Sequence, residues 1–332
     1  MIVSVVIPFK NTLDRLERLL QALAQQTYPH NMIDVIIVDD ASSEPVSSYM
    51  DSSLTDFREL VVLRHEASKG RAASRNAGAF IAKGDLLVFL DSDDLPTPNY
   101  ILELVRAIQK CNQRCIIRAN IRVHPDLITK KNYARYQDSR YIGGRIEAGK
   151  FGYDPNDLPP KFVSTNSLAL LRKHFVELGG FDEDFRAYGG EDEEFGMRAW
   201  TRGFRIVYAQ DALIYDFDDR MSLDRLCRRI PEYIQVSLPM LLAKCPTYVA
   251  HSLYAQITLG NTLRSRLIRA VSLGLGVIGA DAILKCWLRL FDSCTWLRIP
   301  SSIYDIVLAV EVAKAACLGS RINRYPSGGI HQ

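Results

Sequence analysis

The stretch Gly84–Asp94 constrains the fold more than any other part of the chain. Five consecutive apolar residues, Leu86–Leu90, run directly into the sequence Asp-Ser-Asp-Asp. Five residues are too few for a helix, and they predict a strand buried on both faces, as in a parallel sheet. Because ligands of open α/β sheets bind beyond the carboxyl ends of strands, we expect Asp91, Asp93 and Asp94 at the mouth of a site.

Carboxylates packed this closely repel one another unless protons or a cation lie between them. Oxygen ligands suit Mg²⁺ or Mn²⁺, and Mg²⁺ is commonly held by one or two carboxylates together with substrate phosphates. A plain acidic turn after a strand explains the same residues, because Asp and Ser are common in turns. The motif therefore indicates a metal site only together with other evidence.

The first forty residues predict a βαβ unit. Ile2–Ile7 is a buried strand closed by Pro8, apolar residues recur at helical spacing over Leu13–Leu23, and Val35–Val38 is a second strand. No Gly-x-Gly-x-x-Gly motif follows the first strand, which argues against a dinucleotide-binding dehydrogenase.

Asp39 and Asp40 end the second strand. Either carboxylate could accept a hydrogen bond from a base N–H or a ribose hydroxyl. Either could equally serve as a helix cap or a turn residue. The chemistry of the residues alone leaves both interpretations open.

A basic segment follows a third predicted strand, Val61–Leu63. His65–Gly78 carries Lys69 and Arg75 among its three lysines and arginines, together with two glycines, and opens a helix that runs to about Ala82. Cations and glycines at a helix N-terminus form a plausible anion cradle. A solvated basic helix face explains the same pattern.

The remaining elements up to residue 219 alternate between strands, helices and one long connection. Lys130–Leu158, rich in Tyr, Gly and charge, is expected to be a functional loop that acts as a lid or binds the acceptor. The other elements are a helix at Asn99–Lys110, a strand at Cys115–Val123, a strand at Phe162–Leu171, a helix at Lys173–Leu178 and strands at Arg205–Tyr208 and Ala212–Tyr215.

A second acidic cluster begins a predicted helix. Two glycines precede the run Glu191, Asp192, Glu193 and Glu194. Acidic residues in a first helical turn complement the helix dipole, and Glu194 can pair with Arg198 one turn later. Because four consecutive carboxylates also repel one another, at least one should have a raised pKa, which suits a general base at a cleft.

Charge divides the chain into two parts. Residues 220–332 carry 14 Lys and Arg and 6 Asp and Glu, whereas residues 1–219 carry 27 and 32. The acidic part is expected to bind metal and nucleotide, and the basic part suggests an anionic partner such as a membrane surface or a phosphorylated lipid. Nucleic acid is not an expected partner.

The C-terminal hundred residues are predicted to be helical. Arginines interleaved with Trp287, Trp296 and leucines suit an interfacial helix on an anionic membrane. Packing on the catalytic domain or a dimer contact explains the same pattern. The predicted helices are Leu223–Ile230, Pro239–Lys244, Tyr248–Leu259, Leu263–Leu273, Ala280–Phe291 and Ile303–Leu318.

No signal peptide or clean transmembrane segment is evident, and the seven cysteines have no zinc-ligand spacing. We therefore expect reduced thiols and a cytoplasmic protein, bound peripherally to the cytoplasmic face of the inner membrane if the basic helices contact lipid.

Five stretches, in this order, resemble glycosyltransferase family 2, whose members are inverting enzymes with a GT-A fold. The resemblance covers residues 1 to about 219, and the last stretch is closest to chondroitin-polymerase-like and β-galactosyltransferase-like members. The stretches are Ser4–Asn11, Val35–Ser42, Ser74–Gly78, Gly84–Asp94 and Gly179–Arg198.

The resemblance implies a fold and a domain organisation. The expected fold is α/β, with a single Rossmann-like, mixed and mostly parallel sheet flanked by helices and followed by a C-terminal helical extension. Residues 1–219 would form the GT-A domain, with a nucleotide-binding half at 1–125 and an acceptor-binding half at 126–219. Residues 220–332 would form the helical region, associated with a membrane or a partner.

The resemblance also implies roles for single residues. Pro8 and the loop after it, including Phe9, would line the nucleotide pocket. Asp40, with Asp39 beside it, would bind the uracil edge or the ribose. Other residues of the nucleotide site would be Lys69, Arg75, Asp91 and Ser92, and the residues of the metal site would be Asp93 and Asp91.

Asp192 matches the catalytic base of the family, with Glu191 close to the acceptor or the donor sugar. Galactosyltransferase-like members carry a histidine after the strand near residue 215, and no histidine lies between His174 and His251 here. One hypothesis is that Asp216 or Asp218 replaces it as a metal ligand. The other is that water fills the position.

The function implied by the resemblance is transfer of a hexose or N-acetylhexosamine from a nucleotide sugar, most simply a UDP-sugar, with Mn²⁺ or Mg²⁺. The acceptor would be a hydroxyl of a glycan or a lipid-linked oligosaccharide. A non-catalytic nucleotide-sugar-binding or scaffold subunit is the first alternative. The second is a sugar nucleotidyltransferase, which should carry a glycine-rich basic first loop that this chain lacks.

Overall fold

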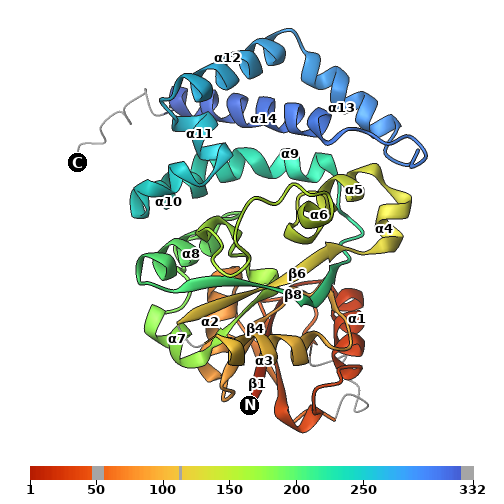
Figure 1. The fold of residues 1–332 in the computed structure, drawn as a ribbon, viewed down its shortest axis with the longest axis vertical. Helices are drawn as coiled ribbons and strands as arrows, with labels where there is room; N and C mark the ends of the chain where they lie inside the picture. The colour runs from red at the N-terminus through yellow and green to blue at the C-terminus, as the bar shows by residue number, and fades with distance from the viewer. Residues whose placement is uncertain (47–55, 112–113, 323–332) are drawn as a thin grey trace. The chain divides into compact units, whose positions relative to one another are not determined.

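The computed structural model describes residues 1–46, 56–111 and 114–322 (Figure 1). The chain divides into two compact units, each formed by three segments. The first unit comprises Met1–Leu127, Gln137–Arg186 and Glu191–Asp219, and the second comprises Ile128–Tyr136, Ala187–Gly190 and Arg220–Gln332.

The described residues of the first unit form one eight-stranded sheet. Its strands are β1 (Val3–Phe9), β2 (Ile33–Asp39), β3 (Glu59–Arg64), β4 (Leu86–Phe89), β5 (Asp94–Pro96), β6 (Cys115–Val123), β7 (Leu168–Leu171) and β8 (Arg205–Asp216). They lie in the order β3-β2-β1-β4-β7-β6-β8-β5. Four of the neighbouring pairs are parallel and three, β4·β7, β6·β7 and β5·β8, are antiparallel. The expected mixed, mostly parallel sheet is confirmed.

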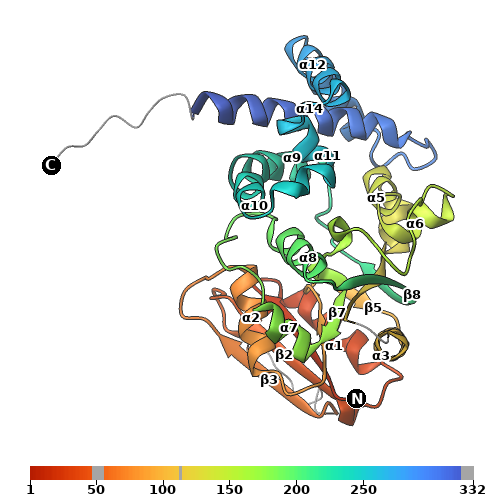
Figure 2. The ribbon, with the colours of Figure 1, turned by 60° about the vertical axis from the view of Figure 1, so that its left-hand side comes forward.

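Helices cover both faces of this sheet, and each face has its own apolar cluster (Figure 2). One cluster joins Leu16 and Leu19 to Val5, and the other joins Phe175 and Phe195 to Phe89. The helices of the first face are α1 (Leu13–Ala24) and α3 (Tyr100–Lys110), and those of the second are α2 (Arg71–Ile81), α7 (Arg172–Leu178) and α8 (Glu191–Thr201).

The carboxyl ends of β1, β2 and β4 meet at one edge because these strands are parallel neighbours. All seven residues of β2 and all four of β4 are buried, as expected of strands covered on both faces. Asp39 is the last residue of β2, and Asp91 follows β4 by two residues. The acidic strand ends predicted from the sequence therefore lie at a common edge.

The segment 130–158 is not the long loop that its composition predicts. Two short helices lie in its first part and a third ends at its first residue, and apolar side chains of these helices such as Leu127, Tyr133 and Ile142 are buried. The helices are α4 (Pro125–Lys130), α5 (Asn132–Asp138) and α6 (Ile142–Glu147). Only the residues after α6 are irregular.

Three strand predictions also need correction. The strand expected at Phe162–Leu171 is formed only at its end, as β7, after 3₁₀ turns at Pro160–Phe162 and Thr165–Ser167. The two strands expected at 205–215 are one strand, β8, whose pairing with β6 skips register after Ala119. Strand β5 was missed because it is three residues long and ends in a proline.

The cysteines depart from expectation at one position. Cys111 and Cys115, which flank the end of α3 and the start of β6, are joined as a disulfide, whereas all seven thiols were expected to be reduced. The other cysteines, Cys227, Cys245, Cys286, Cys294 and Cys317, are not in disulfide bonds.

The second unit is helical, as predicted. Its helices are α9 (Leu223–Glu232), α10 (Leu238–Lys244), α11 (Leu253–Leu259), α12 (Leu263–Val277), α13 (Ala280–Leu290) and α14 (Ser301–Ile322), with a π-helical turn at Tyr233–Ser237. Across the described ranges, no single helix has the length and apolar composition of a membrane span, although α12 and α13 pass that test as a pair bent by 77°.

Gly78 of α2 allows this helix to pack closely on the sheet. A Cβ at this position would lie 2.6 Å from Cγ1 of Val6 and 3.1 Å from Cγ2 of Val38. Both valines are buried strand residues without room to move. Alanine is sterically excluded here although it favours helices.

Gly78→Ala should therefore lower the free energy of unfolding by about 1 to 2 kcal/mol, since overpacking outweighs the gain in helix propensity. Urea denaturation measures the change. Gly152→Ala, where a Cβ meets no atom within 4 Å, is the matched control and should change stability by less than about 0.5 kcal/mol. Equal stability of the two variants would contradict the close packing of α2.

Candidate active site

The loops that follow β1 and β2 are fastened together. The backbone N–H of Asn11 donates to Oγ of Ser42 (3.1 Å), and Oδ1 of Asn11 accepts from the backbone N–H of Ser43 (2.9 Å). Asn11 and Ala41 both have positive φ, 53° and 57°, which is uncommon outside glycine and marks a tightly determined backbone. The two loops therefore form one fixed wall.

This wall encloses a cavity of about 190 Å³. Of the two residues expected to line a nucleotide pocket here, Phe9 lies in the cavity wall, and Pro8 is the residue before it. The lining is half apolar and half polar, which suits a heterocyclic base. The lining residues are Phe9, Asn11, Leu13, Ser43, Glu44 and Val46.

Asp39 lies inside the protein and shapes the loop after β2. It accepts hydrogen bonds from the backbone N–H groups of Ser42 (2.8 Å) and Val46 (3.4 Å) and from the guanidinium of Arg64. Burial opposes its ionisation, but the hydrogen bonds from Ser42, Val46 and Arg64 hold the pKa of Asp39 below its usual value. Asp39 is therefore an anchor of the cavity wall.

Asp40 anchors the loop that leads into α2. Its Oδ1 accepts from Nδ1 of His65 (2.9 Å) and the backbone N–H of Lys69 (2.7 Å), and its Oδ2 accepts from Oγ of Ser68 (2.6 Å) and the N–H of Gly70 (3.1 Å). These donors outweigh burial and lower the pKa of Asp40 to about 2. Since a carboxylate has about four acceptor positions, the protein itself fills those of Asp40.

Arg75 is a buried cation between two acidic segments. Its side chain is 1% exposed, its Nη2 donates to Oδ1 of Asp91 (2.7 Å), and its Nη1 donates to Oε1 of Glu191 (3.2 Å). Burial alone would lower the pKa of this guanidinium, but the charges of Asp91 and Glu191 raise it. Arg75 therefore ties the end of β4 to the start of α8.

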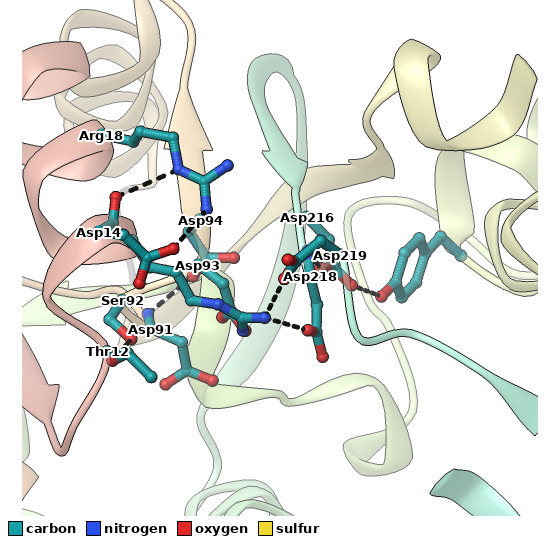
Figure 3. A network of polar contacts seen from close by, with 12 residues as sticks. Thr12, Asp14, Arg18, Asp91, Ser92, Asp93, Asp94, Asp216, Asp218 and Asp219 are labelled. Carbon is teal, nitrogen blue, oxygen red and sulfur yellow. Dashed lines mark hydrogen bonds and ion pairs between the residues drawn. The ribbon is translucent and has the colours of Figure 1, made fainter. Parts of the chain in front are cut away.

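The turn after β4 separates an anchoring carboxylate from two accessible ones (Figure 3). Asp94 is 1% exposed, and its Oδ2 accepts from the backbone N–H of Asp91 (2.7 Å). The side chains of Asp91 and Asp93 are 35% and 25% exposed. Ser92 is joined through its hydroxyl to that of Thr12 in the loop after β1 (3.0 Å). Asp91 and Asp93 are thus the carboxylates of this turn that a ligand can reach.

The pKa of Asp93 is raised to about 7. Burial is the first cause, and the charges of Asp91, Asp216 and Asp218 add to it, whereas Arg15 opposes them. Burial, with the charges of Asp91, Asp93 and Asp216, also raises the pKa of Asp94. The cluster therefore holds more negative charge than its surroundings neutralise.

Arg15 of α1 neutralises part of this cluster and was missed by the sequence analysis. Its side chain is 4% exposed. Its Nη1 donates to Oδ2 of Asp93 (2.8 Å), and its Nη2 donates to Oδ1 of Asp218 (2.8 Å) and also contacts Asp219. A charged residue between the apolar residues of an amphipathic helix is ordinarily expected to face solvent. The partner aspartates of Arg15 lie 78 and more residues away, so no local pattern identifies it.

Asp216, one expected metal ligand, is engaged by the protein. Tyr141 donates its hydroxyl to Oδ2 (2.7 Å), and the backbone N–H of Asp218 donates to Oδ1 (3.0 Å). Burial raises the pKa of Asp216, although the hydrogen bond from Tyr141 opposes this. The other candidate, Asp218, contacts Arg15. Within the described ranges, no three His, Cys, Asp or Glu side chains lie together as a metal-binding group.

Asp91 and Asp93 still fit a divalent cation of the two-carboxylate type. Each carboxylate uses one oxygen for an arginine, Oδ1 of Asp91 for Arg75 and Oδ2 of Asp93 for Arg15. Mg²⁺ and related ions are often bound by one or two carboxylates, with phosphate oxygens and water completing the shell. A cation at this turn would offset the charges of Asp91, Asp216 and Asp218, which add to burial in raising the pKa of Asp93.

The acidic run at the start of α8 is divided among different partners. Glu191 is 5% exposed and pairs with Arg75. Glu194 pairs with Arg198, as the spacing predicts. Asp192, whose Oδ1 accepts from the backbone N–H of Glu193 (3.1 Å), has a pKa well above its usual value because of burial and the charge of Glu193. Asp192 is therefore the carboxylate of this run most ready to hold and release a proton.

Arg118 of β6 is a second buried arginine that the sequence analysis missed. It is 6% exposed, and its Nε and Nη1 have no hydrogen-bond partner among the described residues. Burial lowers its pKa, while the nearby hydroxyls of Tyr141 and Tyr100 raise it. The sequence did contain a signal for this residue, because an arginine in the middle of a strand that is expected to be buried must itself be buried.

Sequence comparison places the chain in a known group. The family model described as "Glycosyltransferase like family 2" matches residues 4–227. The validoxylamine A glucosyltransferase of Streptomyces hygroscopicus subsp. jinggangensis is 28% identical over 64% of this chain and 54% of its own length. Human polypeptide N-acetylgalactosaminyltransferase 10 is 28% identical over 61% of this chain and 35% of its own. The chain thus spans about half or less of the length of these relatives.

Solved structures share the fold. The mannosyltransferase PcManGT from Pyrobaculum calidifontis, in complex with GDP-Man and Mn²⁺, superposes with a TM-score of 0.56 at 18% identity, over 97% of this chain and 88% of its own. S. aureus TarS 1–349 in complex with UDP gives a TM-score of 0.53 at 17% identity, over 100% and 95% of the two chains. The expected GT-A fold is confirmed.

The buried bridge at Arg75 should be a major source of stability. Arg75→Met leaves Asp91 and Glu191 without their cation and should lower the free energy of unfolding by about 3 to 5 kcal/mol. The control is Arg106→Met on α3, which breaks the exposed pair with Glu103 and should cost no more than about 1 kcal/mol. Denaturant titrations in which both variants lose the same small amount would refute the bridge.

Asp93 should make stability depend on pH. The pKa of Asp93 is about 7 in the folded state, above the usual value of 3.8. The contribution of its protonated carboxyl to the free energy of unfolding is therefore full below pH 4 and is lost as the pH rises toward 7. Asp93→Asn removes this loss. In EDTA it should stabilise the protein at pH 8 by about 2 to 3 kcal/mol more than at pH 5. Asp14→Asn, on the exposed side of α1, should show no such difference, and a pH-independent effect at Asp93 would contradict the assignment.

Proposed function

Because the chain belongs to the glycosyltransferase-like family 2, we propose that it transfers a sugar from a nucleotide-sugar donor to an acceptor hydroxyl. The donor is a UDP-sugar carrying a hexose or N-acetylhexosamine. The acceptor is a glycan or a lipid-linked oligosaccharide, and the product enters polysaccharide or oligosaccharide biosynthesis. The observation that carries the proposal is the Arg75 bridge, because it links accessible Asp91 to the helix turn that presents Asp192.

The donor nucleotide occupies the edge of the sheet at the ends of β1, β2 and β4. The cavity beside Phe9 and Asn11 takes the base. Asp39 and Asp40 support this site indirectly, since their carboxylates fix the surrounding loops. TarS binds UDP and PcManGT binds GDP-Man on the same fold, which supports a nucleotide at this edge.

Asp91 and Asp93 would hold Mn²⁺ or Mg²⁺, which would neutralise charge on the departing diphosphate. PcManGT binds Mn²⁺ with its donor, which supports this assignment. Ser92 shapes the turn between the two carboxylates through its contact with Thr12. Asp216 serves the same cluster as a neighbour of Asp94 rather than as an open ligand.

Asp192 is the general base. It takes the proton from the acceptor hydroxyl while the oxygen forms a bond to C1 of the donor sugar, and the bond from C1 to the diphosphate oxygen breaks. A direct displacement inverts C1, so an α-linked donor gives a β-linked product. Glu191 is held by Arg75 and fixes the first turn of α8, which keeps Asp192 in position.

Donor hydrolysis tests the proposal directly. The protein is incubated with a panel of nucleotide sugars and Mn²⁺, Mg²⁺ or EDTA, and release of nucleoside diphosphate is followed. Metal-dependent release of UDP from one donor is expected. If no donor is hydrolysed, calorimetry with UDP decides: binding restricts the protein to a nucleotide-sugar-binding role, and its absence refutes the proposed site.

Asp192→Asn should lower the transfer rate by at least about a hundredfold while UDP affinity stays unchanged, because only the proton acceptor is lost. Glu193→Gln is the matched control on the same helix turn. Since the charge of Glu193 raises the pKa of Asp192, this control should keep activity and move the acidic limb of the pH–rate profile to lower pH. Full activity of Asp192→Asn would remove Asp192 as the base.

A further inference from the structure

Helix α12 turns its apolar side outward. Leu263, Leu267 and Val271 are 85%, 62% and 54% exposed, and their spacing of four places them on one stripe of the helix. Ser265 and Ser272, only 4% exposed each, face the interior of the second unit. A helix that packs its polar residues inward and its leucines outward has an amphipathicity opposite to that of a surface helix in water.

Helix α13 repeats this inverted arrangement. Ile283 and Leu290 are 70% and 69% exposed. On the inward side, Asp281 is 1% exposed and is paired with Lys314 of α14 at 2.6 Å and with Lys285 at 3.4 Å. Both helices therefore bury polar groups against the rest of the unit, α13 together with Leu288, and leave several large apolar side chains of the other side uncovered.

The two apolar stripes are joined at a bend. Val277 and Ile278, at the junction, are 86% and 73% exposed, and the helix axes meet at 77°. Within this unit, α14 lies between α9 on one side and α12 and α13 on the other (Figures 1 and 2). We call the exposed apolar residues of the two helices and their junction, Leu263, Leu267, Val271, Val277, Ile278, Ile283 and Leu290, the α12–α13 surface.

The charges around the α12–α13 surface indicate what covers it. A step of about 100° per residue places Arg264 and Arg266 on the two borders of the α12 stripe, and both are exposed. Trp296, beyond α13, is 81% exposed. Arginine and tryptophan beside an apolar stripe are typical of helices in the headgroup region of anionic membranes. A second copy of the chain would instead bring these same arginines face to face.

We propose that the α12–α13 surface binds an anionic lipid bilayer. At about 1.5 Å per residue, helices of 15 and 11 residues are each shorter than the apolar core of a bilayer, which is about 30 Å thick. They lie in the interface, with Val277 and Ile278 inserted among the acyl chains and the arginines on the headgroups. All residues of this surface belong to the second unit and none to the proposed transferase site, so its test is independent of the transferase assay.

Vesicle flotation tests the proposal with the full chain. Wild-type protein should bind vesicles of 70% phosphatidylcholine and 30% phosphatidylglycerol at least about tenfold more tightly than pure phosphatidylcholine vesicles, because the arginines attract anionic headgroups. Rising salt should weaken the binding. Among the tryptophans, Trp296 should report insertion by a blue shift of its emission, which Trp296→Phe should abolish. Equal binding to both vesicles, or none, would overturn the proposal.

A pair of variants locates the contact. Leu267→Glu with Val271→Glu places charges in the stripe and should lower vesicle affinity at least about tenfold. The control Val176→Glu makes the same change at a similarly exposed position of α7 in the first unit and should have no effect. Arg264→Gln with Arg266→Gln should lower affinity for the anionic vesicles by about fivefold for each charge and reduce the salt dependence.

Light scattering separates lipid from a protein partner. The wild-type chain should stay monomeric across the concentrations used for flotation. A dimer that Leu267→Glu dissociates, without any vesicle binding, would show that a second copy covers the surface and would overturn the proposal. Circular dichroism of each variant checks folding. If a variant fails to fold, the dependence of wild-type binding on salt and lipid composition still tests the proposal.

Discussion

The buried guanidinium of Arg75 is the contact on which the organisation of the active site depends. It lies between Asp91, beyond β4, and Glu191, at the start of α8, and these residues are a hundred positions apart in the chain. Placing an arginine at 1% exposure is costly unless its charge is compensated, and two carboxylates supply that compensation. The bridge therefore fixes the distance between the donor edge of the sheet and the helix turn of Asp192.

Neighbouring carboxylates of the site have different partners. Glu191 and Glu194 have arginine partners, Arg75 and Arg198, whereas Asp192 lies between them with its pKa raised. In the turn after β4, Asp94 accepts a hydrogen bond from the backbone N–H of Asp91, and the pKa of Asp93 is raised to about 7. Environment, rather than residue type, thus separates the acids that have arginine or backbone partners from the acids for which we propose a reactive role.

Much of the first unit could be predicted because its signals are local. Apolar runs such as Leu86–Leu90 specify buried strands wherever they occur, and an acidic residue at the end of such a strand reaches the ligand edge of a parallel sheet. Asp91 and Asp93 were predicted in this way, whereas Asp192 was predicted from the acidic run that opens α8 and from the family resemblance. The helices at 125–147 were not predicted. Each is only six or seven residues long, which is too short to show a helical period of apolar residues.

Long-range contacts account for most of what the sequence did not reveal. Arg15 looked like a solvent-facing residue of an amphipathic helix, and its partner Asp218 lies 203 positions away. Asp40 was assigned to the nucleotide, yet its four hydrogen-bond partners in the next loop could only be seen after folding. The inverted burial of α12 could not be predicted either. The spacing of apolar residues shows which of them share one face of a helix, but not whether that face packs inward or is exposed.

Arg15 has an electrostatic consequence. It holds Asp93 with one nitrogen and, with the other, Asp218 and Asp219, the last residues of the first unit. The chain leaves strand β8 at Asp216, shortly before these residues, and enters the second unit at Arg220. A change in charge at Asp93 therefore changes the charge balance around Arg15, which also pairs with the two residues that precede residue 220.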